Sequence, residues 1–495
     1  MAEASDPDAS PPPGTDAHGP PLPGPRLDRT TGPLLAACFG SGAGSLALVT
    51  ALGKQVYDLS GRELDLGLVG LAEFVPAALL VLVTGAVADR FDRRRVGALS
   101  LVAQAGAALL LVVYTASRPT AVGPLFAIAV VFGVGRAFGA PSIRSLPADA
   151  VPAEHLPWLI PRWSITFQVA LIVGPVLAGS LYALDVRAPY LAAAVLFLAA
   201  AVSVRLVRID RPHPVPGPPA GASATADGPA APGAPGVVAP EGGTGTLPDG
   251  ITPPAGGTPP DADTGSAARP GLRDALDGLV FVRRQPILFG AISLDLFAVL
   301  FGGAVALLPA IAEDRLGVGA VGFGWLRAAT GIGAATVMGV LAFRPVTRHV
   351  GRVLLAVIAV FGLATIALGA TRSYAVAFVA LLVASGADAI SVFIRATLVP
   401  LVTPPTMRGR VLAVENVFIG ASNELGAFES GVAGQLLGPA AAVGLGGVAT
   451  LAVAAAWWFL FPALRDVDRF PGGPGPDAVA SAAAASEATE AATGA

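Results

Sequence analysis

The sequence is poor in cysteine, histidine and charged residues. Among its 495 residues there are one cysteine and four histidines, and 13% of the side chains are charged. The single cysteine, Cys38, excludes an intramolecular disulfide and any metal site built from several cysteines. The histidines, His18, His155, His213 and His349, fall in predicted tails or loops without partners at the spacing of metal ligands, so no metal site is predicted.

Signatures of nucleotide chemistry and of nucleic-acid binding are absent as well. The sequence contains no G-x-x-x-x-G-K-[ST] loop, so the chain itself is not expected to hydrolyse ATP. Its net charge of -3 comes without a basic block that carries interleaved aromatic residues, which excludes a nucleic-acid partner. We therefore predict neither an enzyme nor a bound cofactor.

Apolar side chains, by contrast, are in excess. Hydrophobic residues make up 54% of the chain and the mean hydropathy is +0.69, more than a soluble core can bury. A helix that spans a bilayer needs about 20 largely apolar residues. Twelve such runs occur, near residues 33–53, 66–88, 96–116, 121–141, 163–184, 188–208, 286–311, 321–343, 352–370, 373–397, 411–437 and 439–463. We expect an all-α membrane protein with 12 transmembrane helices, because outer-membrane barrels show short alternating segments instead.

Basic residues are distributed unequally between the two sides of this twelve-span arrangement. One side collects most arginines, from Arg90 after the second run to Arg465 after the last. The few basic residues on the other side, such as Lys54 and Arg315, have acidic neighbours. Positive residues in short loops stay in the cytoplasm, so both termini are predicted to be cytoplasmic.

The chain divides into five predicted parts. Residues 211–270 are rich in proline, glycine and alanine and hold no aromatic residue, so they cannot bury enough apolar surface to fold. Residues 272–284 place their leucines largely on one helical face, which suits a helix at the membrane interface. The predicted parts are a disordered cytoplasmic tail (1–32), a six-helix half (33–210), a disordered cytoplasmic linker (211–270), an interfacial helix with a second six-helix half (271–465) and a disordered cytoplasmic tail (466–495).

The two halves share a weak internal repeat. Residues 135–151 align with residues 386–402, and the matching pairs are Gly135 with Gly386, Ile143 with Ile394, Arg144 with Arg395, and Val151 with Val402. The matches lie at equivalent places in equivalent spans. Two pseudo-symmetric six-helix halves of this kind are the arrangement of a transporter whose site lies between the halves.

A dense group of charges, G-A-V-A-D-R-F-D-R-R-R at residues 85–95, separates the second run from the third. It resembles the signature of the major facilitator superfamily in this loop, roughly G-x-L-a-D-r-x-G-r-k. Gly85, Asp89, Arg90, Arg93 and Arg94 occupy the matching positions. A different residue, aspartate, replaces the second glycine of that pattern at position 92, so the tight turn of the family is not expected to be kept.

The resemblance implies a role for this loop in gating. In the superfamily the aspartate of the motif holds the cytoplasmic gate closed by pairing with the N-terminal end of helix eleven and with nearby arginines. Asp89 is the corresponding residue, and the arginines expected to act with it are Arg93, Arg144, its repeat counterpart Arg395, and Arg410. A simple topological anchor that obeys the distribution of positive charge is the alternative.

The fifth run carries a second resemblance. "VALIVGPVLAG", residues 169–179, is similar to the fifth-helix motif of superfamily antiporters, with Gly174, Pro175 and Gly179 at the matching positions. Together with residues 407–438 it resembles the drug and siderophore exporters of the superfamily. That resemblance implies export of a small organic molecule, proton antiport, a monomer, and a place in the bacterial cytoplasmic (inner) membrane.

Charged residues inside spans are costly and therefore indicate function. In this superfamily helices one, four, seven and ten line the cavity, so Arg136, Asp295 and Asp388 are the candidates for the pathway of proton and substrate. A structural pair between Arg136 and Asp388 is an equally open interpretation. Glu415, which follows the arginines of the eleventh run, is also consistent with an interfacial residue.

Two other functions fit the same sequence. One is an importer of the same fold, which the fifth-helix motif disfavours. The other is a non-transporting membrane sensor or scaffold that uses the linker and the acidic C-terminal tail. A scaffold has no need of intramembrane Arg136, Asp295 and Asp388, so we favour a transporter. The substrate is not encoded in any pattern that we can read.

Overall fold

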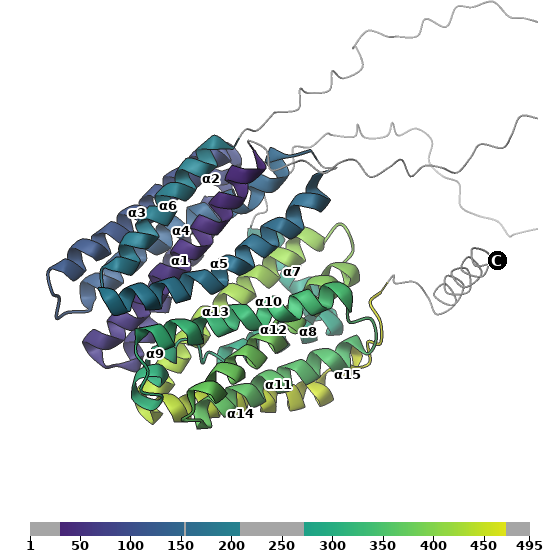
Figure 1. Ribbon diagram of the computed structural model, residues 1–495. Coiled ribbons are helices and arrows are strands. Elements are labelled where there is room, and N and C mark those ends of the chain that lie inside the picture. Colours follow the sequence, from purple (N-terminus) through teal and green to yellow (C-terminus); the bar gives the residue numbers. More distant parts are fainter. Residues whose placement is uncertain (1–29, 153–154, 208–271, 472–495) are drawn as a thin grey trace, which may run out of the picture. The chain divides into compact units, whose positions relative to one another are not determined.

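Long apolar runs fold into helices because the bilayer interior offers no water to a free backbone, so each segment must satisfy its own N–H and C=O groups. The computed structural model describes residues 30–152, 155–207 and 272–471, and within these ranges every regular element is helical (Figure 1). The predicted linker (211–270) and most of both predicted tails lie outside the described residues.

The first half of the chain forms six helices. They are α1 (Thr31–Ser60), α2 (Glu63–Arg90), α3 (Arg93–Ala116), α4 (Gly123–Ala150), α5 (Leu156–Leu184) and α6 (Ala188–Leu206). The second half begins with the short helix α7 (Leu272–Arg284). It continues with α8 (Pro286–Phe301), α9 (Leu308–Ala310), the π-helical turn η2 (Ile311–Arg315), α10 (Ala320–Phe343), α11 (Val350–Ala370), α12 (Tyr374–Val402), α13 (Arg408–Leu437), α14 (Pro439–Leu460) and α15 (Pro462–Arg465).

Each of the twelve predicted apolar runs corresponds to one main helix, and the seventh run also includes the short α9. Nine of the described helices are individually long and apolar enough to cross a membrane, and ten if α7 and α8 count as one bent span. The helices α2 and α13, which carry Glu73 and Glu424, are not among these nine. The all-helical fold is confirmed, while the count of twelve spans rests on the match between runs and helices.

Helix packing repeats from one half to the other. In the first half α3 packs on α4 and α6, α2 packs on α4, and α1 packs on α5 and α6. In the second half α11 packs on α12 and α14, α10 packs on α12, and α8 packs on α13 and α14. The two sets of contacts are identical when the helices α1, α2, α3, α4, α5 and α6 correspond, in this order, to α8, α10, α11, α12, α13 and α14. The predicted pseudo-symmetric halves are therefore present.

The halves meet through two symmetry-related helix pairs, α5 with α10 and α2 with α13. Glycines allow this approach. A Cβ atom added at Gly179 would lie 2.4 Å from the carbonyl oxygen of Ala320, and one added at Gly67 would lie 3.0 Å from that of Ala427. These crossings lie near the C-terminus of α5 and the N-terminus of α2. Toward the other end of the bundle α5 and α10 diverge (Figure 1).

Two segments at the arginine-rich end extend the bundle. α7 meets α8 at an angle of 104° and packs against the start of α13. Residues 466–471, which the sequence assigns to the C-terminal tail, pack instead against the start of α11. There the backbone N–H groups of Val350 and Gly351 donate to the carbonyl oxygens of Asp468 and Val467 at 3.2 and 2.9 Å.

Candidate functional site

Four charged side chains from four helices lie between the two halves, in the middle parts of their helices. Arg136 of α4 is central: its Nη1 atom is 3.4 Å from Oε2 of Glu73 on α2, and its Nη2 atom is 3.9 Å from Oε1 of Glu424 on α13. Arg327 of α10 is close enough to interact electrostatically with both glutamates. We call these four residues the central quartet.

Close helix crossings position the quartet. α2 and α4 touch at Gly133, where an added Cβ atom would lie 2.3 Å from the carbonyl oxygen of Glu73. One turn later along α4, Arg136 therefore reaches the Glu73 carboxylate. On the other side of α2, Gly70 leaves room for Glu424, whose Oε2 atom would lie 3.0 Å from a Cβ atom at that position. Small residues thus bring charges of both halves together.

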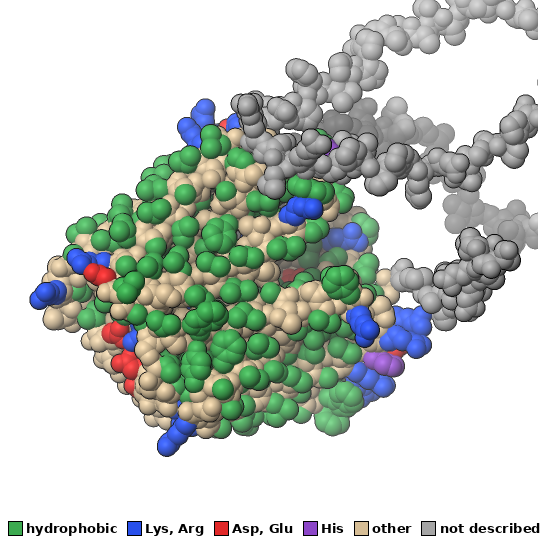
Figure 2. All heavy atoms as spheres, in the orientation of Figure 1, with side chains coloured by type: hydrophobic (Ala, Val, Ile, Leu, Met, Phe, Trp, Pro, Cys, Tyr) green, Lys and Arg blue, Asp and Glu red, His purple; other side chains and the backbone are tan. Residues whose placement is uncertain are grey.

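The quartet is partly open to solvent. The Arg136 side chain is 38% exposed although it lies between helices of both halves, whereas the Glu73 side chain is 5% exposed. Figure 2 shows a recess between α5 and α10 with acidic side-chain atoms in its depth. Among the described residues Oε1 of Glu73 has no hydrogen-bond partner. Two loose ion pairs and one unpaired oxygen leave polar groups that an entering molecule can engage.

A second charge cluster is buried within the C-terminal half. Arg395 of α12 places Nη2 at 2.6 Å from Oδ1 of Asp295 on α8, and Nη1 at 3.8 Å from Oε1 of Glu415 on α13. Asp388, also on α12, interacts with both Asp295 and Arg395. We call these four residues the C-half cluster. Three carboxylates share one guanidinium in an apolar surrounding, so an excess of negative charge is left to be compensated.

The structure separates the residues that the sequence grouped into one pathway. Arg136 belongs to the central quartet, while Asp295 and Asp388 belong to the C-half cluster. Arg136 pairs with Glu73 and Glu424, so the alternative of an Arg136–Asp388 pair is wrong. Glu415 is buried and ion-paired, which corrects its interpretation as an interfacial residue.

The charged loop between α2 and α3 is built around Asp92. This residue ends the loop with φ of -59° and accepts a hydrogen bond from the backbone N–H of Arg94 at 2.9 Å, so it is the N-cap of α3. The hydrogen bond from the Arg94 side chain lowers the pKa of the Asp92 carboxyl. Asp92 thus replaces the glycine turn of the family with a capped helix start.

The predicted gating residues lie in different surroundings. Arg93 forms an ion pair with Asp149 of α4 at 2.9 Å, while Arg90 and Arg144 are exposed. The surroundings of Gly85 and of the Asp89 side chain lie outside what the structure describes. The Arg410 guanidinium is 3.6 Å from the Met407 sulfur. Arg395, also predicted to act with this loop, is 3% exposed and belongs to the C-half cluster, where it pairs with Asp295.

The predicted fifth-helix motif lies at two helix contacts. A Cβ atom added at Gly174 would lie 2.8 Å from the Cβ atom of Leu46 on α1. The carbonyl oxygen of Pro175 would lie 2.7 Å from a Cβ atom added at Gly324 of α10, next to the Gly179 crossing described above. The motif therefore joins α5 both to its own half and to the other half.

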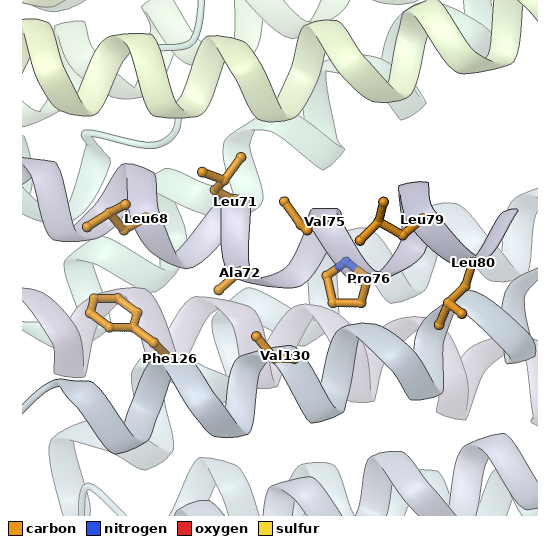
Figure 3. Close-up of a pocket in the computed structure, with 9 residues that line it drawn as sticks. All are labelled: Leu68, Leu71, Ala72, Val75, Pro76, Leu79, Leu80, Phe126 and Val130. Carbon is orange, nitrogen blue, oxygen red and sulfur yellow. The ribbon is translucent and has the colours of Figure 1, made fainter.

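An apolar groove lies between α2 and α4 (Figure 3). Its volume is about 640 Å³ and it is lined by Leu68, Leu71, Ala72, Val75, Pro76, Leu79, Leu80, Phe126 and Val130. None of these side chains can hydrogen-bond, so we do not include the groove in the candidate site. Within the described ranges no group of three or more His, Cys, Asp or Glu side chains could hold a metal ion.

Sequence reasoning missed three members of the central quartet. Glu73 and Glu424 are intramembrane charges in the sequence but were not predicted to line the pathway, and Arg327 was not among the predicted residues. A signal existed, because Arg327 is the one charged residue in the run of residues 320–343. A lone arginine in an apolar span predicts a buried partner.

Known proteins share this architecture. Residues 34–427 match the family model of the Major Facilitator Superfamily. Over 170 residues the chain is 27% identical to macrolide efflux protein A of Streptococcus pyogenes, an alignment that covers 34% of this chain and 42% of that protein. The chain thus aligns with less than half of that relative's length.

Solved structures agree at the level of the fold. A bacterial homologue of the human lysosomal transporter Spinster, inward-facing and unoccupied, is 16% identical with a TM-score of 0.60, over 91% of this chain and 100% of that chain. The nucleoside transporter NupG is 14% identical with a TM-score of 0.56, over 87% and 98% of the two chains. The family match, which covers most of the chain, and this shared fold lead to one conclusion: the chain belongs to the Major Facilitator Superfamily.

Proposed function

We propose that this protein is a secondary-active exporter that moves a small organic molecule out of the cytoplasm in exchange for protons, by alternating access. The observation that carries the proposal is the central quartet. Its charges come from both halves, and solvent reaches Arg136 between them. A molecule that binds there contacts both halves at once, which is what a carrier needs in order to link binding to their relative movement.

Two features support export as the direction of transport. The Gly174, Pro175 and Gly179 motif resembles that of antiporters, and the aligned relative is named a macrolide efflux protein. The substrate class that fits best is a drug-like compound such as a macrolide, and a siderophore is the second choice. In this proposal α5 flexes at Pro175 while Gly179 keeps α10 in close contact.

The proton site in this proposal is the C-half cluster. Asp295 and Asp388 share Arg395 with Glu415, and a buried excess of carboxylates favours uptake of a proton. The proton site and the substrate site are separate, but α13 belongs to both, because it carries Glu415 and Glu424. Binding at either site can therefore affect the same movement of the halves. The loop with Asp89 would then bias the cycle from the cytoplasmic side.

Charge distribution supports a place in the bacterial inner membrane with both termini in the cytoplasm. Lys and Arg side chains gather at the ends of the bundle, and hydrophobic side chains cover the surface between them (Figure 2). The end at which α2 ends and α13 begins holds Arg90, Arg144 and Arg408, all exposed. If this end lies in the cytoplasm, the divergence of α5 and α10 there corresponds to an inward-facing state in this proposal. A monomer is sufficient for this cycle.

A cell assay tests the proposal. Expression in a drug-sensitive bacterial strain should raise the inhibitory concentration of a macrolide and lower its accumulation in the cells. Arg136→Gln should abolish both effects, because the central quartet loses the guanidinium that joins Glu73 to Glu424. Arg118→Gln, in the loop between α3 and α4, serves as a control on an exposed arginine. Increased accumulation on expression of the wild type would instead indicate the importer.

A further inference from the structure

We infer that Lys54 is a residue of the transport cycle: it holds the end of the bundle at which α1 ends closed by joining the two halves. The inference rests on alternating access, one part of the proposed function, but not on the direction of transport or on the coupling ion. Lys54 lies in the last two turns of α1, and one of its partners, Glu313, lies on η2, which belongs to the C-terminal half.

Two contacts join α1 to η2. The Lys54 ammonium is 2.7 Å from Oε2 of Glu313 and also pairs with Asp58 on its own helix. The Tyr57 hydroxyl donates a hydrogen bond to the Asp314 carboxylate. We call Lys54, Tyr57, Asp58, Glu313 and Asp314 the latch. Adjacent acidic residues of η2 thus each bind a different residue of α1, so the latch fixes both the distance and the register of the halves.

Burial strengthens the latch. Lys54 is 7% exposed, and Tyr57, Leu66 and Ala310 form a small apolar cluster that spans α1, α2 and α9. Because the Lys54 ammonium is largely shielded from water, its attraction to the half-exposed Glu313 carboxylate is stronger than that of a pair on the open surface. Tyr182 of α5 adds to this by donating a hydrogen bond of 2.6 Å to Asp58, which fixes the carboxylate that shares Lys54.

The geometry of η2 favours this arrangement. The turn is π-helical, a form that occurs mostly as single turns at functional sites. It places Glu313 and Asp314 in succession toward α1, while Arg315 turns to the C-terminus of α11 and donates to the carbonyl oxygens of Thr371 and Ala370 at 2.6 and 2.7 Å. The latch is thereby anchored to a long helix of the C-terminal half.

The latch has to open in each transport cycle, because a carrier exposes its site to this side only when the halves separate here. The hydrogen bond from Lys54 keeps the pKa of Glu313 below its usual value, so the pair stays ionised at neutral pH. Lys54 faces Asp58 as well as Glu313, and Asp314 lies beside them. Opening therefore costs free energy, and the latch contributes to that cost whichever ligand or ion drives the cycle.

Distance measurements by electron paramagnetic resonance test the role of Lys54. Spin labels are placed at Arg62→Cys and Arg372→Cys, on exposed loops of different halves at this end, in a Cys38→Ser background. The protein is studied in nanodiscs without substrate or proton gradient. Lys54→Gln and Glu313→Gln should each shift the closed-to-open ratio about fivefold toward the open state, and the double variant should shift it no further.

A matched control separates the latch from a general loss of surface charge. Arg187 pairs with Asp185 at 2.6 Å at the same end but within one half, so Arg187→Gln should leave the ratio unchanged. If Lys54→Gln does not fold, Glu313→Gln decides alone, because its side chain is 47% exposed. Unchanged distances in folded Glu313→Gln would overturn the inference. The labels respond to conformation only, so a protein that imports, or uses another ion, would still show the effect.

Discussion

Asp92 lies where the superfamily pattern has a glycine, and it begins α3 by capping the helix instead of forming a tight glycine turn. A glycine at this place would supply a turn, whereas Asp92 supplies a side-chain oxygen for the free N–H of Arg94. We predict that Asp92→Ala lowers the free energy of unfolding by about 1 kcal/mol at neutral pH, the usual cost of a lost N-cap. Asp92→Asn should keep the stability, because asparagine caps as well as aspartate. Thermal unfolding of the purified variants checks both.

The same residue gives a pH dependence with a defined sign. The pKa of Asp92 is lower in the folded protein than its ordinary value, since Arg94 donates to the ionised form. Its extra stability is therefore present above the ordinary aspartate pKa of about 4 and is lost as pH falls through the lower folded value. Between pH 6 and pH 3 the unfolding temperature of the wild type should therefore fall by more than that of Asp92→Asn. A constant difference would show that Asp92 does not cap in its ionised form.

Gly179 tests the contact between the halves. A side chain there would meet the backbone of α10, because even a Cβ atom would lie 2.4 Å from the Ala320 carbonyl oxygen. We predict that Gly179→Val costs about 1–3 kcal/mol of stability and reduces transport. Gly106→Val on α3 is the control, since no atom lies within 4 Å of an added Cβ atom at that position. Equal behaviour of the two variants would contradict the close approach of α5 and α10.

The sequence predicted which single charged residues lie inside the spans but not which residues form ion pairs with them. Arg144 and Arg395 occupy equivalent places in the repeat, yet Arg144 is exposed while Arg395 is buried beside Asp295. The difference arises because α8 and α13 contribute carboxylates in the second half, and helix neighbours are a property of the tertiary fold. Arg136 illustrates the same limit, since both of its partners lie on other helices.

At the scale of elements, the start of α11 depends on the segment after α15. The carbonyl oxygens of Val467 and Asp468 accept the first N–H groups of α11, and Gly351 allows this approach, because a Cβ atom there would lie 1.8 Å from the Leu464 carbonyl oxygen. We predict that a chain truncated after Arg465 unfolds several degrees lower, about the effect of two lost backbone hydrogen bonds.

Truncation after Pro471 is the control for that experiment, since it keeps both carbonyl groups. Thermal unfolding in the same detergent compares the two chains. If both truncated chains unfold at the same temperature, the segment of residues 466–471 does not stabilise α11. From the sequence this segment was predicted to belong to the C-terminal tail, since Pro, Gly and Ala dominate the residues after it. Composition cannot predict a backbone contact with a distant helix.

Helix positions were predictable because the bilayer requires continuous apolar runs, and each run became one main helix. The bend between α7 and α8 was harder to predict from the sequence, although Gln285 and Pro286 interrupt the run there. The π-helical turn η2 has no signal in the pattern of apolar residues. Its acidic pair, Glu313 and Asp314, was interpreted as dilution of positive charge, whereas both side chains bind α1.

At the scale of the whole molecule, the internal repeat correctly predicted two similar halves, since the same helix contacts occur in both. The buried charges break this symmetry. The buried C-half cluster pairs Asp295 with Arg395, whereas Arg144, the counterpart of Arg395 in the first half, is exposed. We therefore expect the two halves to have different roles. The second half binds the proton, and the first half carries the loop with Asp89 that contributes to gating.

That assignment makes a prediction for Asp295 and Asp388. Asn mimics the protonated carboxyl, so Asp295→Asn and Asp388→Asn should each abolish uphill export while downhill exchange of substrate persists. Glu429→Gln is the control, because it removes a carboxylate of α13 that belongs to neither the central quartet nor the C-half cluster. Proton-driven export at wild-type rates in both aspartate variants would exclude the C-half cluster from coupling.

Transport by the purified protein tests proton-coupled export without the other proteins of the cell. The wild type is reconstituted into liposomes, and a pH gradient is imposed with the acidic side on the face where α1 ends, the side of the latch. We expect a labelled macrolide to move uphill toward the acidic side and protons to move the opposite way, and we expect Arg136→Gln to abolish both fluxes. Macrolide that only equilibrates across the membrane, at the same rate with and without the gradient, would contradict proton-coupled export.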